Sequence, residues 1–237
     1  MNADRDAYIR LLGLEGWSKK RLRKAALQRA HEIRMFEIEH FWRRANYFWL
    51  LQAAVFTAVG LSLFSDKAAK IAILPVVLAA LGAVTGSASW FASQGSKFWL
   101  SNWERHIDML EDEFEGGLHK SVFIGAKGTR WSVSRLNDGL GVAFFIFWII
   151  VLIFASVQAN PTWPCQPTNQ LSDICWNQLL TIVCWLGMVG GVWFLSNQQS
   201  AVTGAFHDAG GKIAAAYSGA DAAVKGKTGL AIREPKI

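Results

Sequence analysis

Five side chains in two segments of the chain are of types that bind metal ions. They are Glu37, His40, Glu104, His106 and Asp108. Di-iron helical bundles use the Glu-x-x-His spacing twice. Here it occurs once, at Glu37 and His40, because Trp103 stands three residues before His106. We therefore expect no metal site and assign these side chains to packing beside an aromatic layer. A metalloenzyme using Glu37, His40 and His106 is the least favoured alternative.

Other patterns typical of active sites are missing from the sequence. It contains no HExxH run, no G-x-S-x-G elbow and no four-cysteine cluster. The run 226–228, Gly-Lys-Thr, resembles the end of a phosphate-binding loop, but Asp221 stands where that loop requires its first glycine. We therefore expect no enzymatic activity and no cofactor.

The composition predicts that these residues belong to a membrane protein. Hydrophobic residues make up 52% of the 237 residues and charged residues only 18%, whereas soluble domains carry roughly 25% charged residues. Nothing in the polar stretch 1–44 resembles a cleavable signal. Four apolar segments approach the roughly 20 residues that a helix needs to span a bilayer. They are 45–64, 71–92, 140–157 and 176–195.

None of the four segments contains Asp, Glu, Lys, Arg or His, which argues against ion-coupled transport, since transporters place ionisable groups inside their spans. The basic residues predict the orientation. The stretches 1–44, 93–138 and 196–237 hold 22 of the 24 Lys and Arg residues. By the positive-inside rule these three stretches, and so both termini, are cytoplasmic. Because the basic excess follows topology, we expect no nucleic-acid partner.

The predicted fold class is an all-α integral membrane protein with four transmembrane helices, the first two extended into a cytoplasmic helical stalk. The N-terminal helix (1–44) leads into a first transmembrane hairpin (45–92) with a tight turn at 65–70. A cytoplasmic helix and loop (93–138) precede a second hairpin (139–195). The tail (196–237) is rich in Ala and Gly and is expected to be mobile beyond His207.

The stalk is predicted to be two antiparallel helical extensions, ended by Gly116 and Gly117 in the second. Equal distances from the membrane place basic residues of one extension level with acidic residues of the other. The expected matches are Arg21 with Glu115, Arg23 with Glu113, Lys24 with Asp112, and Glu32 with Arg105. The amphipathic stretch 1–17 can pack on the stalk or touch the membrane surface, and the sequence leaves both open.

Cys165 and Cys175 lie in the predicted periplasmic loop 158–175. An oxidising compartment favours a disulfide between them, with two unpaired thiols as the alternative. Glycines at four-residue spacing, Gly82 with Gly86 and Gly187 with Gly191, indicate close helix packing. The second pair, with Gly190 beside it, forms the denser cluster, and the spacing cannot separate contacts within one subunit from contacts between subunits.

Three stretches carry a family resemblance. They are 32–39 followed by Trp42 and 47–49, 95–99 followed by 102–112, and 132–137. Together they resemble the RipA family of octameric bacterial membrane proteins, over roughly residues 32–137. The resemblance implies an inner-membrane ring of eight subunits and carries over no catalytic residue. We expect the ring contacts in the stalk layer around Trp42, Trp99, Trp103 and His106.

Two functions fit these observations. The first is a homo-oligomeric scaffold or regulatory protein that needs neither a polar pore nor an active site. The alternative is an oligomeric channel or membrane-perturbing effector with an apolar gate. Membrane lipid and further copies of the chain are the expected partners, and an unidentified cytoplasmic partner stays open.

Overall fold

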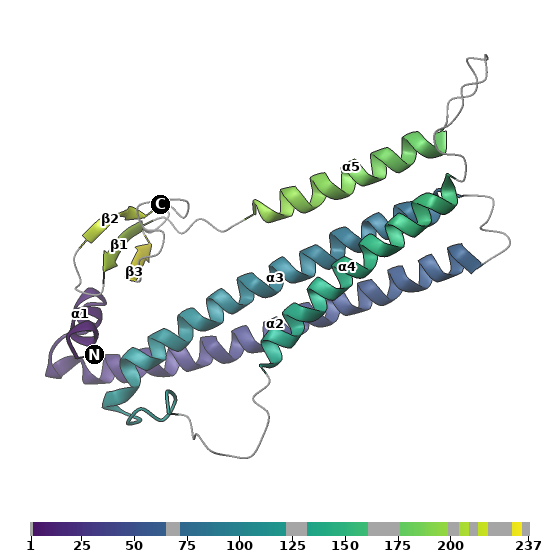
Figure 1. The fold of residues 1–237 in the computed structure, drawn as a ribbon. Coiled ribbons are helices and arrows are strands. Elements are labelled where there is room, and N and C mark those ends of the chain that lie inside the picture. The colour runs from purple at the N-terminus through teal and green to yellow at the C-terminus, as the bar shows by residue number, and fades with distance from the viewer. Residues whose placement is uncertain are drawn as a thin grey trace, which may run out of the picture. The chain divides into compact units, whose positions relative to one another are not determined.

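A computed structural model (Figure 1) describes residues 2–64, 72–121, 132–160 and 176–198, together with the backbone of three strands in the tail. The chain divides into two compact units. The stalk unit comprises Met1–Glu37, Trp99–Lys127 and Gln199–Ile237, and the membrane unit comprises Ile38–Phe98 and Gly128–Gln198. Helices α2 and α3 contribute to both units.

Four helices are long and apolar enough to cross a membrane, which confirms the predicted fold class. They are α2 (Lys20–Phe64), α3 (Leu74–Leu110), α4 (Val133–Ala159) and α5 (Trp176–Ser196). With 45 and 37 residues, α2 and α3 exceed the roughly 20 residues of a span. Both therefore continue well beyond their apolar segments, as the sequence predicts.

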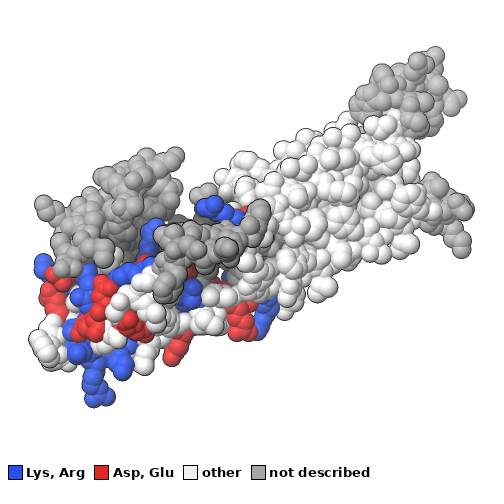
Figure 2. All heavy atoms as spheres, turned by 60° about the horizontal axis from the view of Figure 1, so that its bottom comes forward, with Lys and Arg blue, Asp and Glu red and all other residues white. Residues whose placement is uncertain are grey.

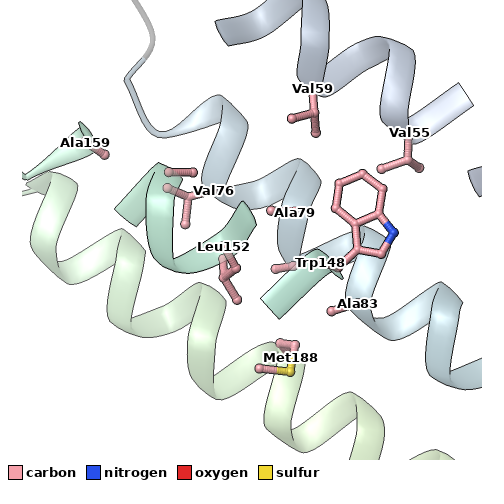
Figure 3. Close-up of a cluster of buried hydrophobic side chains, with 11 residues drawn as sticks. Val55, Val59, Val76, Ala79, Ala83, Trp148, Leu152, Ala159 and Met188 are labelled. Carbon is pink, nitrogen blue, oxygen red and sulfur yellow. The ribbon is translucent and has the colours of Figure 1, made fainter. Parts of the chain in front are cut away.

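The core of the membrane unit collects small and large side chains from all four helices. Val55 and Val59 of α2 face Val76 and Ala79 of α3, and the indole of Trp148 from α4 lies among them (Figure 3). The outward faces are apolar too, with Ile150 of α4 61% exposed and Leu186 of α5 66% exposed. On the face drawn in Figure 2 charged side chains gather over the stalk residues, and the helices of the membrane unit present almost none. Such a surface requires lipid or another subunit against it.

The stalk unit has a separate core. Helix α1 (Asn2–Leu11) supplies Tyr8 and Ile9 to it, and α2 and α3 complete it. The buried residues contributed by these two helices are Leu27, Ala30, Ile107 and Leu110. The N-terminal stretch thus packs on the stalk through Tyr8 and Ile9, which answers a choice that the sequence leaves open, although Trp17 remains 90% exposed.

The end of α3 turns around a buried carboxylate. After a short 3₁₀ turn, Glu111–Glu113, the backbone takes positive φ values at Gly116 and Gly117, a conformation that favours glycine. These are the two glycines predicted to stop the helix. The side chain of Glu111 is 0% exposed and accepts hydrogen bonds from the backbone N–H groups of His119 (2.7 Å) and Lys120 (3.3 Å).

The tail contains three short strands that the sequence analysis does not predict. They are β1 (Gly204–Asp208), β2 (Ile213–Tyr217) and β3 (Gly229–Arg233), and they form an antiparallel sheet in the order β2-β1-β3. The remaining tail residues lie outside the described ones, so the expected mobility of the tail stays a prediction. The turn at 65–70 and both Cys165 and Cys175 also lie outside the described residues, and the disulfide likewise stays a prediction.

Candidate functional site

An ion pair in the stalk unit joins α2 to the 3₁₀ turn that follows α3. The guanidinium of Arg23 donates to both carboxylate oxygens of Glu113, at 2.8 and 2.9 Å. Its third nitrogen donates to the backbone carbonyls of Leu14 and Gly16, at 2.8 and 2.9 Å. The two side chains are only 11% and 21% exposed. The hydrogen bond from Arg23 lowers the pKa of Glu113. A partly buried bidentate pair of this kind fixes both partners in one geometry.

The predicted charge map is therefore correct at Arg23 and Glu113 and wrong at the neighbouring position. Glu115 binds His31, at 3.2 Å, and not Arg21. Residues two apart on a helix do not share a face, and since Arg23 points at α3, Arg21 points away. Equal distance from the membrane predicts the level at which two residues can meet. It does not predict which side of its helix each residue occupies.

The two remaining matches of the map show the same limitation. Glu32 pairs along its own helix with Arg29, at 2.9 Å, and not with Arg105. The contact between helices at this level joins Arg34 to Glu104, at 3.3 Å. Further along, Asp112 binds Lys120, at 2.5 Å, instead of Lys24.

An aromatic and imidazole cluster lies next to these ion pairs. The hydroxyl of Tyr8 and Nδ1 of His106 are 2.7 Å apart and joined by a hydrogen bond. The ring of Trp103 lies against the same imidazole, with ring centroids 5.2 Å apart. Burial lowers the pKa of His106 and raises the pKa of Tyr8. Trp103 and His106, expected in the stalk layer, thus make their described contacts within one chain.

We expect the stability of the stalk unit to fall on mild acidification. The folded-state pKa of His106 lies below its ordinary value of 6.5. The contribution of neutral His106 is therefore complete above that value and is lost as the pH falls through the lowered pKa. The wild type should therefore unfold at a lower temperature at pH 5.5 than at pH 7.5. His106→Gln should show a smaller difference between the two pH values, and an unchanged difference would contradict the assignment.

The other residues expected in the stalk layer are spread over both units. Glu37, His40 and Trp99 are half-buried, and each interacts with neighbouring groups. The ring of Trp42 packs edge-on against that of Phe41, with centroids 5.1 Å apart. Asp108 lies 3.5 Å from His119. Within the described ranges no three His, Cys, Asp or Glu side chains converge as metal ligands. The assignment of these side chains to packing stays a prediction.

A polar chain crosses the middle of the membrane unit. The indole N–H of Trp148 donates to Oε1 of Gln52, at 2.5 Å, and Nε2 of Gln52 donates to the hydroxyl of Thr85, at 2.9 Å. Gln52 is 1% exposed and Trp148 is 0% exposed. Three helices are joined here by buried hydrogen bonds. The sequence signal for this chain is Gln52 itself, the one glutamine in the first apolar segment.

The tightest glycine contact is on α3, and not in the cluster of Gly187, Gly190 and Gly191 that the sequence analysis considers the denser one. A Cβ built on Gly82 would lie 2.3 Å from the ring of Trp148, and one on Gly86 would lie 3.4 Å from the backbone of Phe145. On α5, Gly191 approaches Val84, with 3.3 Å for its Cβ, whereas Gly187 has nothing within 4 Å. The pair on α3 therefore mediates packing within the chain. For Gly187 the choice between contacts within one subunit and contacts between subunits stays open.

A second polar cluster ties α3 to the first turns of α4, within the membrane unit. Asp138 forms an ion pair with Lys97 and accepts hydrogen bonds from Ser93, at 2.7 Å, and Gln94, at 3.0 Å. Asn137 donates to Ser93, at 3.2 Å. The sequence analysis misses this cluster because it places Asp138 at the end of a loop. The helix in fact begins at Val133, with Ser132 as its N-cap.

Comparison with known proteins gives one match. The model of the octameric membrane protein family (8xMP) matches residues 24–157, from the stalk part of α2 to the end of the apolar part of α4. No curated protein and no solved structure matches the chain. The match confirms the resemblance to octameric membrane proteins, while the narrower name RipA is not part of it. Spanning more than half of the sequence, it places this chain in the octameric membrane protein family.

Proposed function

We propose that the chain is the subunit of a homo-oligomeric scaffold or regulatory protein of the bacterial inner membrane, without catalytic activity. The observation that carries the proposal is the length and bracing of α2 and α3. At about 1.5 Å per residue, the 45 residues of α2 measure roughly 68 Å. A hydrocarbon core is only about 30 Å thick. The helix therefore has a long part outside the bilayer, braced by Arg23 and Glu113.

Membership in the family supports assembly of the chain into an oligomer. A family of octameric membrane proteins indicates self-assembly in a membrane, and closed rotational symmetry is the usual arrangement of identical subunits. Each copy then adds one braced stalk to the assembly. A ring of identical projecting helices suits the recruitment or organisation of other molecules, which is the work of a scaffold.

The distribution of charge supports the proposed orientation. The stretches outside the apolar segments that carry 22 of the 24 Lys and Arg residues include the whole of both stalk helices. By the positive-inside rule we assign the stalk and both termini to the cytoplasm. The described core of the membrane unit is apolar around Gln52, which supports a structural function over transport.

Native mass spectrometry in mild detergent and in nanodiscs tests the proposal. One dominant high-order species, of eight copies, is expected for the wild type. Trp42→Ala, in the predicted stalk layer, should shift the population toward smaller species. A wild type that stays monomeric or dimeric at all concentrations would overturn the scaffold. Conductance of the purified assembly in planar bilayers would instead favour the channel.

A further inference from the structure

A small crevice opens between α2, α3 and α4 in the membrane unit. Its empty volume is about 210 Å³. Residues from all three helices line it, among them Phe41, Arg44, Phe48, Ser89, Ser93 and Asn137. The volume is below the roughly 300–1,000 Å³ of pockets for drug-sized ligands. The crevice is therefore suited to one small group of a larger molecule.

The lining has the chemistry of an anion site with an apolar wall. Arg44 is the one ionic side chain among the lining residues, all of which the structure describes. The Ser89 hydroxyl has no hydrogen-bond partner among the described residues, so it is available as a donor. The rings of Phe41 and Phe48 supply the apolar part. A guanidinium beside hydroxyl and amide groups matches the oxygens of a phosphate.

The charged neighbours of the crevice are already paired with one another. Asp138 is matched by Lys97, and Glu39 by Arg43, at 2.6 Å. The hydroxyl of Ser93 donates to Asp138. Neither carboxylate is therefore left to repel an anion at the crevice, and the positive charge of Arg44 lies on its wall.

The level of the crevice in the chain points to the source of the anion. Residues 45 and 92, which also line it, are the first residue of the first predicted span and the last residue of the second. This is the height at which the apolar segments end and lipid headgroups begin. Basic pockets between transmembrane helices on the cytoplasmic side are known to bind phospholipid headgroups.

We propose that this crevice binds the headgroup phosphate of an anionic phospholipid. Arg44 holds the phosphate oxygens by charge-assisted hydrogen bonds, with Ser89 and Asn137 as further polar contacts. The acyl chains leave the crevice past Phe48 and lie along the apolar outer faces of the helices. The inference is independent of the scaffold function, since it concerns one subunit and its lipid.

The test measures lipid retention by the purified full-length protein. Delipidated protein in detergent is titrated with phosphatidylglycerol or phosphatidylcholine, and bound lipid is counted by native mass spectrometry. The wild type should prefer phosphatidylglycerol. Arg44→Gln should weaken its binding by on the order of tenfold or more, as expected when a hydrogen bond to a charged group is lost. Arg44→Lys should retain part of it, and Ser89→Ala should weaken it less.

Arg43→Gln is the matched control, because Arg43 is the adjacent arginine and does not line the crevice. It should leave phosphatidylglycerol binding within about twofold of the wild type. Equal losses in the two glutamine variants would indicate a general charge effect and overturn the site. So would equal binding of both lipids, or equally tight binding of inorganic phosphate, which would point to a soluble anion. If Arg44→Gln fails to fold, unchanged binding in both Arg44→Lys and Ser89→Ala overturns it.

Discussion

Gly82→Ala should destabilise the membrane unit by about 1–3 kcal/mol, the usual cost of overpacking. The added Cβ would lie 2.3 Å from the ring of Trp148. That ring is fully buried, and its N–H is held by Gln52, so it cannot move aside without breaking the hydrogen bond. Alanine otherwise stabilises a helix by about 1 kcal/mol over glycine, so a loss would be a direct sign of the close contact.

Thermal unfolding of the detergent-solubilised protein, followed by tryptophan fluorescence, measures this effect. The matched control is Gly187→Ala, because nothing lies within 4 Å of a Cβ at that position. It should be neutral or stabilising. Adding Trp148→Leu to Gly82→Ala should cost less than the sum of the two single changes, because the smaller side chain removes the clash. Equal behaviour of the two glycine variants would rule out the close packing of Gly82 on Trp148.

Glu113→Gln should destabilise the stalk unit by about 1–3 kcal/mol, because it leaves a partly buried charged group without its hydrogen-bond partner. Arg23 would keep its charge at 11% exposure while losing its carboxylate. The control is Glu15→Gln, since the pair of Glu15 with Arg10 is well exposed and such pairs contribute less than about 1 kcal/mol. Chemical unfolding monitored by circular dichroism separates the two variants. Similar midpoints would mean that the Arg23–Glu113 pair is no stronger than a surface pair.

The same pair gives an acid dependence with a definite sign. The pKa of Glu113 is lowered in the folded state, chiefly by the hydrogen bond from Arg23. Its contribution is therefore complete above the ordinary glutamate value of 4.5 and is lost as the pH falls through the lowered pKa. Exchanging the two charges should restore little, because Arg23 also donates to the carbonyls of Leu14 and Gly16. A glutamate at position 23 cannot replace those bonds.

Most of the helical framework follows from the sequence because lipid imposes a simple requirement. The predicted spans 140–157 and 176–195 lie inside α4 and α5, since only a long run of apolar side chains satisfies a bilayer. The pairing of Arg23 with Glu113 is predictable for a similar reason. The rise per residue of a helix is fixed, so two extensions leaving the membrane together bring residues of equal distance to the same level.

The remaining contacts could not be predicted from the spacing of residues along the sequence. Whether Arg21 or Arg23 faces the other helix depends on rotation about the helix axis. The close approach of Gly82 depends on a tryptophan 66 positions away in the sequence. The burial of Glu111 could not be predicted either. A carboxylate is buried only where hydrogen-bond donors satisfy it, and here the donors are the backbone N–H groups of His119 and Lys120. The strands of the tail have no strong alternation of apolar and polar residues to reveal them.

The polar chain through Gln52 limits how the spans can move past one another. Apolar helices in hydrocarbon can slide lengthwise at little energetic cost, since the apolar surface of a helix is similar before and after the shift. A slide of one helical turn, about 5.4 Å, would separate Gln52 from both Trp148 and Thr85 and leave polar groups without partners in a medium that supplies none. The three helices joined there are thus held against piston motion. A signal passing along α2 through the bilayer would have to travel as a tilt or a rotation of the joined helices.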